Sequence, residues 1–249
     1  MVSSEELYNK FAQYYRFYSR KKRNYIDSID KLILKNLPIK HNKVLDVGCG
    51  DGIRGIRLFK KMWGKKILMI DNSDEMVKLA KKLETPKIKV KKMDISMEKL
   101  RLEAKSDVIL CLWNVLGHVP SVNQRLTTLK NMRRLLKNGG KIYIDISNRY
   151  NIRYYRLRKV FINILRDFLR PNPKNGDFDY KIMVSKHTKI DSTCHFFNPF
   201  EIESLIRKAG LEVKKRYSID YRTGQLRKTF FEGHLLYVLE KSIRDLIVN

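Results

Sequence analysis

The sequence predicts an α/β fold, in which a largely parallel sheet carries helices on both of its faces. Three observations favour this class. Short apolar runs alternate with segments of helical periodicity, which is typical of strands joined by crossover helices. Five such runs, at 43–47, 66–70, 87–93, 107–112 and 141–146, are expected to be buried strands, and a glycine-rich turn follows the first. The length of 249 residues suits one sizeable core.

The elements between and after these strands follow the same pattern. Helices are expected at 52–63, 73–83 and 122–136, with Ser73 placed to cap the second of them. Beyond 148 the order becomes less regular: a basic, aromatic helix at 151–169, a turn-rich break at 171–176, strand-like alternation at 179–197, a helix at 200–209, and last strands at 211–217 and 234–239. We expect an N-terminal helical cap at 1–36. The main domain would span 37–249, with a substrate-lid insertion at about 149–197.

The net charge of +27 is the unusual bulk property. A positive field of this size favours anionic partners: nucleic acid, anionic lipid, or a phosphorylated or carboxylated small molecule. The charge is spread along the whole chain, so a general lysine bias of the source genome would produce the same number. Hydrophobic and aromatic contents of 43% and 10% exclude a disordered chain.

Cysteine usage and hydropathy further narrow the class of protein. Cys49, Cys111 and Cys194 show neither metal-ligand spacing nor an even disulfide framework, so we expect small buried thiols and no metal site. No apolar run approaches the roughly 20 residues that span a bilayer. The N-terminal segment lacks the apolar core of a secretory signal. These features predict a cytoplasmic protein.

The most specific motif is VLDVGCGDG at 44–52, where a strand turns into a helix. Gly48 and Gly50 allow a tight turn and a close approach of backbone to ligand, because they carry no Cβ. The amides at the start of the following helix favour electron-rich groups. A dinucleotide fingerprint would need a third glycine where Ile53 stands. The motif therefore predicts a nucleoside ligand other than a dinucleotide.

An apolar pair, an acid and Gly-x-Gly-x-Gly together resemble motif I of the Rossmann-like (class I) S-adenosylmethionine (SAM)-dependent methyltransferases. This resemblance implies a seven-stranded methyltransferase sheet and SAM as the cofactor. It also implies that Asp46 helps to hold the amino group of the methionine part of SAM. Gly48 and Gly50 would line the path of that part, and Cys49 between them is a further expected cofactor residue.

Two further acids end predicted strands. Asp71 follows the second strand, where a carboxylate can accept both ribose hydroxyls of an adenosine. Asp94 follows the third, and the resemblance implies that it accepts from the adenine amino group while Ile95 flanks the ring. Any one of these acids could be a helix cap, but three in register favour a nucleoside site. Further cofactor contacts are expected from Asn72, Met76, Leu112 and Trp113, although Met76 is also placed to face the core.

Methyl transfer would occur where strands four and five end. Asn114 and His118 follow strand four, and this stretch is similar to small-molecule N-methyltransferases of the glycine N-methyltransferase type, which carry Asn-x-x-x-His there. In-line transfer needs alignment and desolvation more than strong acid–base groups. His118 is the candidate base, since an unperturbed histidine has a pKa of about 6.5, and Asn114 is the candidate orienting amide. His118 could also simply pack a loop.

The residues after strand five are expected to contact the acceptor: Asn148, Arg149, Tyr150 and Arg153. The arginine is offset from the position where the resembled family binds a carboxylate, so an amino-acid acceptor does not carry over. In the N-terminal cap, Tyr14 and Tyr15 lie where related enzymes place a tyrosine over the cofactor. We expect Tyr15 at the reacting centre and Tyr14 near the acceptor.

Two basic, aromatic segments at 10–23 and 149–159 leave the acceptor class open. Aromatic rings among arginines suit stacking on bases and contact with phosphates. The same pattern fits an amphipathic lid helix with its rings on the buried face. We therefore expect a SAM-dependent methyltransferase acting on an anionic or amine-bearing small molecule. The alternatives are a methyltransferase for tRNA or another RNA, and a non-catalytic module that binds SAM or RNA.

Sequence motifs of two nucleobase methylases are absent after strand four. There is no Asn/Asp-Pro-Pro-Tyr, which disfavours methylation of exocyclic base amines, and no Pro-Cys, which disfavours the covalent route to cytosine C5.

Overall fold

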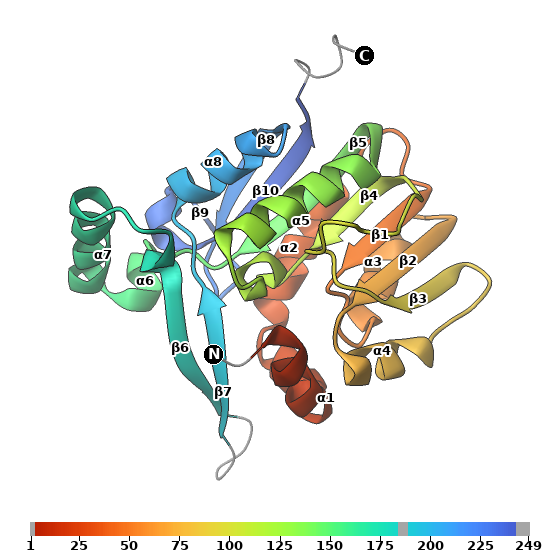
Figure 1. Cartoon of the computed structure of the whole chain (residues 1–249), viewed down its shortest axis with the longest axis horizontal. Helices are drawn as coiled ribbons and strands as arrows, with labels where there is room; N and C mark the ends of the chain where they lie inside the picture. Colours follow the sequence, from red (N-terminus) through yellow and green to blue (C-terminus); the bar gives the residue numbers. More distant parts are fainter. Residues whose placement is uncertain (1–2, 184–188, 243–249) are drawn as a thin grey trace.

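Eight strands form the central sheet of the computed structural model, which describes residues 3–183 and 189–242. They are β1 (Lys43–Val47), β2 (Lys66–Asp71), β3 (Ile88–Lys92), β4 (Ser106–Cys111), β5 (Leu136–Ile146), β8 (Leu211–Ile219), β9 (Leu226–Arg227) and β10 (His234–Lys241). Their order across the sheet is β3-β2-β1-β4-β5-β10-β8-β9 (Figure 1). The neighbours among β1 to β5 are parallel, whereas β10 is antiparallel to both β5 and β8.

The predicted α/β fold with a mostly parallel sheet is confirmed, but the count of seven strands is wrong. The additional strand is β9, a two-residue segment whose pairing with the end of β8 is too short to leave a periodic signal. Residues 136–140, which precede the expected fifth strand at 141–146, also belong to β5. Gly139 there has a φ of +74°, and the register between β4 and β5 shifts.

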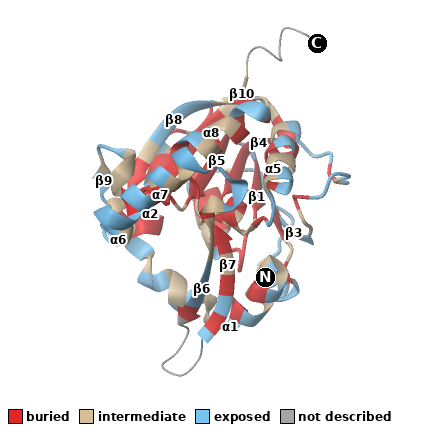
Figure 2. Ribbon diagram, turned by 60° about the vertical axis from the view of Figure 1, so that its left-hand side comes forward, coloured by how far each residue is buried: buried red, intermediate tan, exposed pale blue. Residues whose placement is uncertain are grey.

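Helices cover both faces of the sheet. α2 (Arg23–Lys35), α3 (Ile53–Lys61) and α4 (Asp74–Lys81) pack on one face, and α5 (Val122–Leu135) and α8 (Pro199–Lys208) on the other. Adjacent strand residues point to opposite sides, so Val44 joins the first layer and Leu45 the second. Figure 2 shows the buried strands between helices that are buried on one side and exposed on the other.

The N-terminal segment divides into two helices with different surroundings. α2 belongs to the core, where Ile29 and Ile33 are fully buried. α1 (Ser4–Lys21) lies instead across the carboxyl ends of the strands, against α4 and the strand β7 (Lys189–His195) (Figure 1). Its Leu7 and Phe11 pack against Ile182 and Ile190. The first helix therefore covers the carboxyl ends of the strands, whereas the second belongs mainly to the core.

The segment after β5 contains α6 (Ile152–Tyr155), α7 (Leu157–Leu169), the 3-10 turn η2 (Pro173–Gly176), and a hairpin of β6 (Asp177–Met183) with β7. A single helix at 151–169 was expected, but Arg156 adopts a φ of +66° and separates α6 from α7. The expected strand-like alternation at 179–197 is this hairpin, apart from residues 184–188, which lie outside the described residues. Two more short 3-10 turns, η1 (Val115–His118) and η3 (Phe230–Glu232), follow β4 and precede β10. Among the described helices, none combines the length and apolarity that a membrane crossing requires.

Candidate active site

The glycine-rich turn after β1 is tied to the end of β2. The amides of Gly48 and Cys49 donate to the carbonyl oxygen of Ile70 at 2.8 and 3.1 Å. The amide of Gly50 donates to Asp71 Oδ2 at 2.8 Å. Gly48 and Gly50 have φ values of +66° and +57°, which a residue with a side chain rarely adopts. The predicted bend is therefore held in a conformation that suits glycine.

A narrow cleft of about 80 Å³ lies over this turn, roofed by α1 and η1. A Cβ on Gly48 would lie 2.5 Å from Val115 Cγ2, and one on Gly50 would lie 2.9 Å from the Tyr15 hydroxyl. Backbone therefore forms the floor of the cleft because no side chain fits there. Many of the predicted cofactor residues line it: Gly48, Gly50, Asp71, Asn72, Asp94, Ile95, Leu112 and Trp113.

Two of the three predicted acids meet in the cleft. Asp71 Oδ1 accepts from the Ser73 amide at 3.0 Å, and burial raises the pKa of this carboxyl. Asp94 is half-buried, and its Oδ1 accepts from the Ser96 amide at 2.8 Å. A carboxylate oxygen can accept more than one hydrogen bond. Both acids therefore retain acceptor capacity for a ligand.

Asp46, Cys49 and Met76 do not line the cleft. Asp46 lies beneath the turn, where its carboxylate fills the space beside Gly55 of α3, and burial raises its pKa to about 7. The Cys49 thiol is buried and faces the carbonyl oxygen of Gly50. Met76 is fully buried, as its alternative core-facing interpretation predicts. Asp46 and Cys49 thus belong to the motif without lining the cleft, and Met76 belongs to the core.

The chain leaves β4 through two consecutive left-handed residues, Trp113 with a φ of +65° and Asn114 with a φ of +61°. This conformation costs a non-glycine residue about 1–3 kcal/mol. Asp145 on β5 holds it: Oδ1 accepts from the amides of Trp113 at 2.9 Å and Asn114 at 3.2 Å, and the Asp145 carbonyl accepts from Asn114 at 3.0 Å. Burial raises the pKa of Asp145 to about 6.

The side chain of Asn114 is engaged within the protein. Its Nδ2 donates to Cys194 Sγ at 2.7 Å, and its Oδ1 accepts from the Ser147 amide at 2.9 Å. These contacts join the exits of β4 and β5 to the hairpin strand β7. The Asn114 side chain, which was expected to orient a ligand, therefore holds together the wall of the site.

His118 lies where η1 meets α1. Its Nε2 is 3.2 Å from the Tyr8 hydroxyl, while its buried Nδ1 has no hydrogen-bond partner among residues 3–183 and 189–242. Burial lowers the pKa of His118 to about 4, so the ring is neutral near pH 7. The sequence indicated His118, but nothing in the N-terminal pattern indicated its partner Tyr8.

A second, larger cavity of about 300 Å³ adjoins the cleft. The two hollows share four lining side chains, those of Tyr8, Tyr15, Trp113 and His118. Most of the remaining wall is aromatic and comes from distant parts of the chain: Tyr18, Tyr25, Tyr154, Tyr155, Tyr180, Phe196 and Tyr221. We call this hollow the aromatic cavity. Tyr15 was predicted at the reacting centre, whereas Tyr14 lines neither hollow and packs in the cluster around Phe11.

His234 at the start of β10 adds a polar group that sequence reasoning missed. Its Nδ1 accepts from the Asn148 amide at 3.0 Å, so Nε2 carries the proton of the neutral ring. Burial lowers its pKa to about 3. The ring lies 4.8 Å from that of Tyr221 and 5.9 Å from that of Tyr154, in the wall of the aromatic cavity. His234 is therefore a fixed hydrogen-bond donor there.

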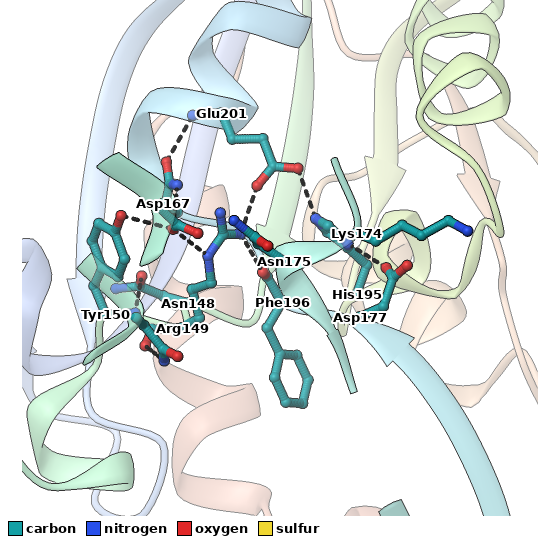
Figure 3. Close-up of polar contacts among 12 residues, drawn as sticks. Asn148, Arg149, Tyr150, Asp167, Lys174, Asn175, Asp177, His195, Phe196 and Glu201 are labelled. Atoms are coloured by element: carbon teal, nitrogen blue, oxygen red, sulfur yellow. Dashed lines mark hydrogen bonds and ion pairs between the residues drawn. The ribbon is translucent and has the colours of Figure 1, made fainter. Parts of the chain in front are cut away.

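The residues predicted to bind acceptor after β5 form a separate polar network (Figure 3). Arg149 Nε lies 2.7 Å from Asp167 Oδ2, and its Nη1 lies 2.6 Å from Glu201 Oε2. The Tyr150 hydroxyl donates to Asp167 at 2.8 Å. None of these residues lines the cleft or the aromatic cavity.

The other two predicted acceptor residues are also engaged elsewhere. Asn148 is fully buried and donates to the carbonyls of Phe230 and Gly233. Arg153 forms a half-exposed pair with Glu232 at 3.5 Å. The partners of these four residues lie on α7, α8 and the segment 230–233, and such partners cannot be inferred from a local pattern.

Comparisons with known proteins agree with this architecture. Residues 44–140 match a family model described as a methyltransferase domain. Curated relatives include a ubiquinone biosynthesis O-methyltransferase of Coxiella burnetii, 29% identical over 193 residues, or 77% of this chain and 72% of the relative. The protein of that name from Pseudomonas aeruginosa is 28% identical over 183 residues, or 72% of this chain and 68% of the relative.

Solved structures share the fold at lower identity. A SAM-dependent methyltransferase from Clostridium acetobutylicum superposes with a TM-score of 0.63 at 21% identity, covering 94% of this chain and 99% of that one. A Haloferax volcanii complex between the Trm112 methyltransferase activator and a methyltransferase gives 0.65 at 18% identity, covering 96% and 98%. These likenesses establish the fold.

The network around Arg149 yields a stability prediction. Arg149→Met removes the cation and leaves Asp167 and Glu201 largely buried without it, so we expect the free energy of unfolding to fall by about 3–5 kcal/mol. Urea denaturation followed by circular dichroism measures this loss. Arg153→Met is the matched control, and loss of its half-exposed pair costs less than about 1 kcal/mol. Equal stability of the two variants would contradict a structural role for Arg149.

Proposed function

Because the chain is a SAM-dependent methyltransferase with a Rossmann-like fold, we propose that it methylates a hydroxyl oxygen of a small aromatic acceptor held in the aromatic cavity. The observation that carries this proposal is the wall common to the two hollows. Tyr8, Tyr15, Trp113 and His118 each line both of them, so a methyl donor in one lies next to an acceptor in the other.

The cleft fits SAM by the chemistry of its residues. The Asp71 carboxylate would accept from the ribose hydroxyls and Asp94 from the adenine amino group, with Met93 and Ile95 as apolar walls. The bare backbone of the glycine turn leaves space for the methionine part. When bound, SAM supplies a methyl group activated by a positively charged sulfur.

The aromatic cavity suits a small planar acceptor. Its volume of about 300 Å³ is at the lower end of the range for small-molecule sites. Aromatic pairs gain about 0.5–1.5 kcal/mol beyond their buried area, so rings such as Tyr155 and Tyr180 favour an aromatic guest. The Nε2–H of His234 would donate to an oxygen of that guest. The name of the curated relatives, O-methyltransferase, supports oxygen as the acceptor atom.

An amino-acid acceptor, by contrast, finds little support. The likeness to glycine N-methyltransferase relatives rests on Asn114 and His118, and the Asn114 amide is engaged with Cys194 and Ser147. The arginine that would receive a carboxylate, Arg149, is enclosed by Asp167 and Glu201. The amide and the arginine on which an amino-acid acceptor would depend are thus both engaged within the protein, and we favour a hydroxylated ring over a free amino acid.

His118 is the group that would take the proton. The neutral imidazole of His118, which lines both hollows, would accept the hydroxyl proton as the acceptor oxygen is methylated. Its Nε2 lies 3.2 Å from the Tyr8 oxygen, and this contact fixes the ring. The aromatic walls exclude water and hold the acceptor in line, which supplies most of the acceleration in such a displacement.

RNA remains the second candidate acceptor because of the positive charge, but the positions of the aromatic rings favour a small molecule. Tyr15, Tyr18 and Tyr155, which come from the two basic segments, line the aromatic cavity instead of forming an exposed stacking surface. A base would have to enter the hollow between α1 and the hairpin. The geometry therefore favours the small acceptor.

Acceptor class is tested by labelled SAM with three substrates: hydroxylated aromatic rings, the matching aromatic amines, and bulk tRNA. We expect label in the hydroxylated rings. In the variant Ser147→Leu, a larger side chain in the cavity wall should raise KM for the ring at least about 10-fold while the SAM affinity is unchanged. Label appearing in tRNA alone would overturn the proposed acceptor.

The ribose role of Asp71 is tested by Asp71→Asn. Loss of a charged acceptor should weaken SAM binding by about 1–3 kcal/mol, measured by calorimetry. Asp74→Asn is a suitable control, because Asp74 is an exposed carboxylate on the same segment that pairs with Lys92. Unchanged SAM affinity in Asp71→Asn would remove Asp71 from the site.

The pKa of His118 predicts the pH profile. A base acts in its neutral form, and burial lowers this pKa to about 4, so kcat/KM should stay level down to about pH 5 and fall only as His118 becomes protonated near pH 4. His118→Asn should reduce kcat and abolish that fall, with the SAM affinity preserved. An acid limb centred on the ordinary histidine value in wild type would contradict a buried, neutral base.

A further inference from the structure

Helix α7 presents an apolar face to solvent. Leu157, Phe161, Phe168 and Leu169 have exposed fractions of 73%, 58%, 83% and 68%, and Ile162 and Leu165 are also exposed. Single exposed apolar residues are ordinary, but a cluster on one element marks an interaction surface. In Figure 1, α7 stands at the left edge of the molecule, away from the central sheet.

The other side of α7 is the one that faces the protein. Val160 and Asn163 are its buried residues, and Asn163 Nδ2 donates to the carbonyl oxygen of Arg149 at 3.2 Å. Asp167 on the same side joins the network with Arg149. Residues 157, 161, 165 and 168 follow helical spacing and lie on the outward side. The amphipathic helix is therefore anchored by a largely polar face, with its apolar face free.

Basic residues flank this apolar face. Arg158 and Arg170 are exposed and form no ion pair within the described part of the chain. Lys159 lies 5.7 Å from the centre of the Tyr155 ring. Together with the net charge of +27, these residues give the surface the composition of a helix that lies in a membrane interface, with bulky apolar residues on one side and cations around them.

We propose that α7 is an interfacial helix that docks the enzyme on an anionic lipid surface. Phe161 and Phe168 would enter the acyl boundary, while Arg158 and Arg170 reach phosphate groups. The charge of the chain favours an anionic lipid surface over a second copy of the chain, and the apolar side chains favour it over a nucleic acid. Two copies with a charge of +27 repel each other, and a phosphate backbone satisfies the arginines but gives the phenylalanines nothing apolar to enter.

The position of α7 gives the docking a consequence for the enzyme. Lys159 of α7 and Tyr154 and Tyr155 of α6 line the aromatic cavity, so docking would bring this side of the cavity to the bilayer. The docking itself does not depend on the proposed acceptor, because lipid binding is measured without any substrate.

Vesicle sedimentation with the full chain tests the inference. We expect binding to vesicles of equal parts phosphatidylcholine and phosphatidylglycerol, weak binding to phosphatidylcholine alone, and a decrease with added salt. The double variant Phe161→Ser/Phe168→Ser should lower the partition coefficient at least about 10-fold. Arg158→Gln/Arg170→Gln should lower it about 5-fold per residue on the anionic vesicles.

The control variant is Ile39→Ser/Trp63→Ser, which removes two exposed apolar side chains from the segments after α2 and α3 and should bind as wild type does. Circular dichroism melting shows that each variant is folded. The inference fails if wild type ignores anionic vesicles, or if the phenylalanine variant binds them equally well. It also fails if light scattering shows self-association that the phenylalanine variant abolishes.

Discussion

The hydrogen bonds from the Trp113 and Asn114 amides to Asp145 are the constraint on which the two hollows depend. Two left-handed residues in succession are costly, and one buried carboxylate oxygen accepts from both of their amides. The resulting bend places the Trp113 ring in the wall between cleft and cavity. It also directs the Asn114 side chain toward β7 and starts the turn that carries His118.

The aromatic cavity is assembled from parts of the chain that lie far apart in the sequence. α1 and α2 contribute Tyr15 and Tyr25, α6 contributes Tyr155, and the last third of the chain contributes Tyr221 and His234. Both histidines in its wall have pKa values lowered by burial, so the wall holds neutral imidazoles. Among the described residues that line this cavity, Lys159 is the only lysine or arginine, so the positive charge of the protein lies mainly elsewhere.

The sequence was sufficient where the signal is local. Apolar runs and a glycine bend identify β1 to β5, and acids at strand ends identify Asp71 and Asp94, since parallel strands bring their carboxyl ends to one edge. Contacts between residues that are distant in the sequence could not be predicted from it. Arg149 appeared to be a ligand residue because nothing nearby showed that Asp167 and Glu201 enclose it, and His234 appeared to be the start of a strand.

The same limit applies to helix orientation and to the motif itself. Amphipathic spacing predicts that α7 has an apolar face, but only the packed structure shows that the face with Phe161 and Phe168 is turned outward. Asp46 belongs to the motif by position, yet the alternation of strand residues places it with Gly55 beneath the turn. Positions expected from the resemblance therefore agree best with the structure where the backbone itself forms the cleft.

The place of β10 constrains how the protein is made. This strand pairs with β5 on one side and β8 on the other, so the facing edges of β5 and β8 have no partner until residues 234–241 have been synthesised. Before then β5 and β8 present open edges, which are prone to non-native pairing. The donor His234 arrives with the same strand, so a nascent chain emerging from the ribosome has no complete cavity until its final strand has been inserted.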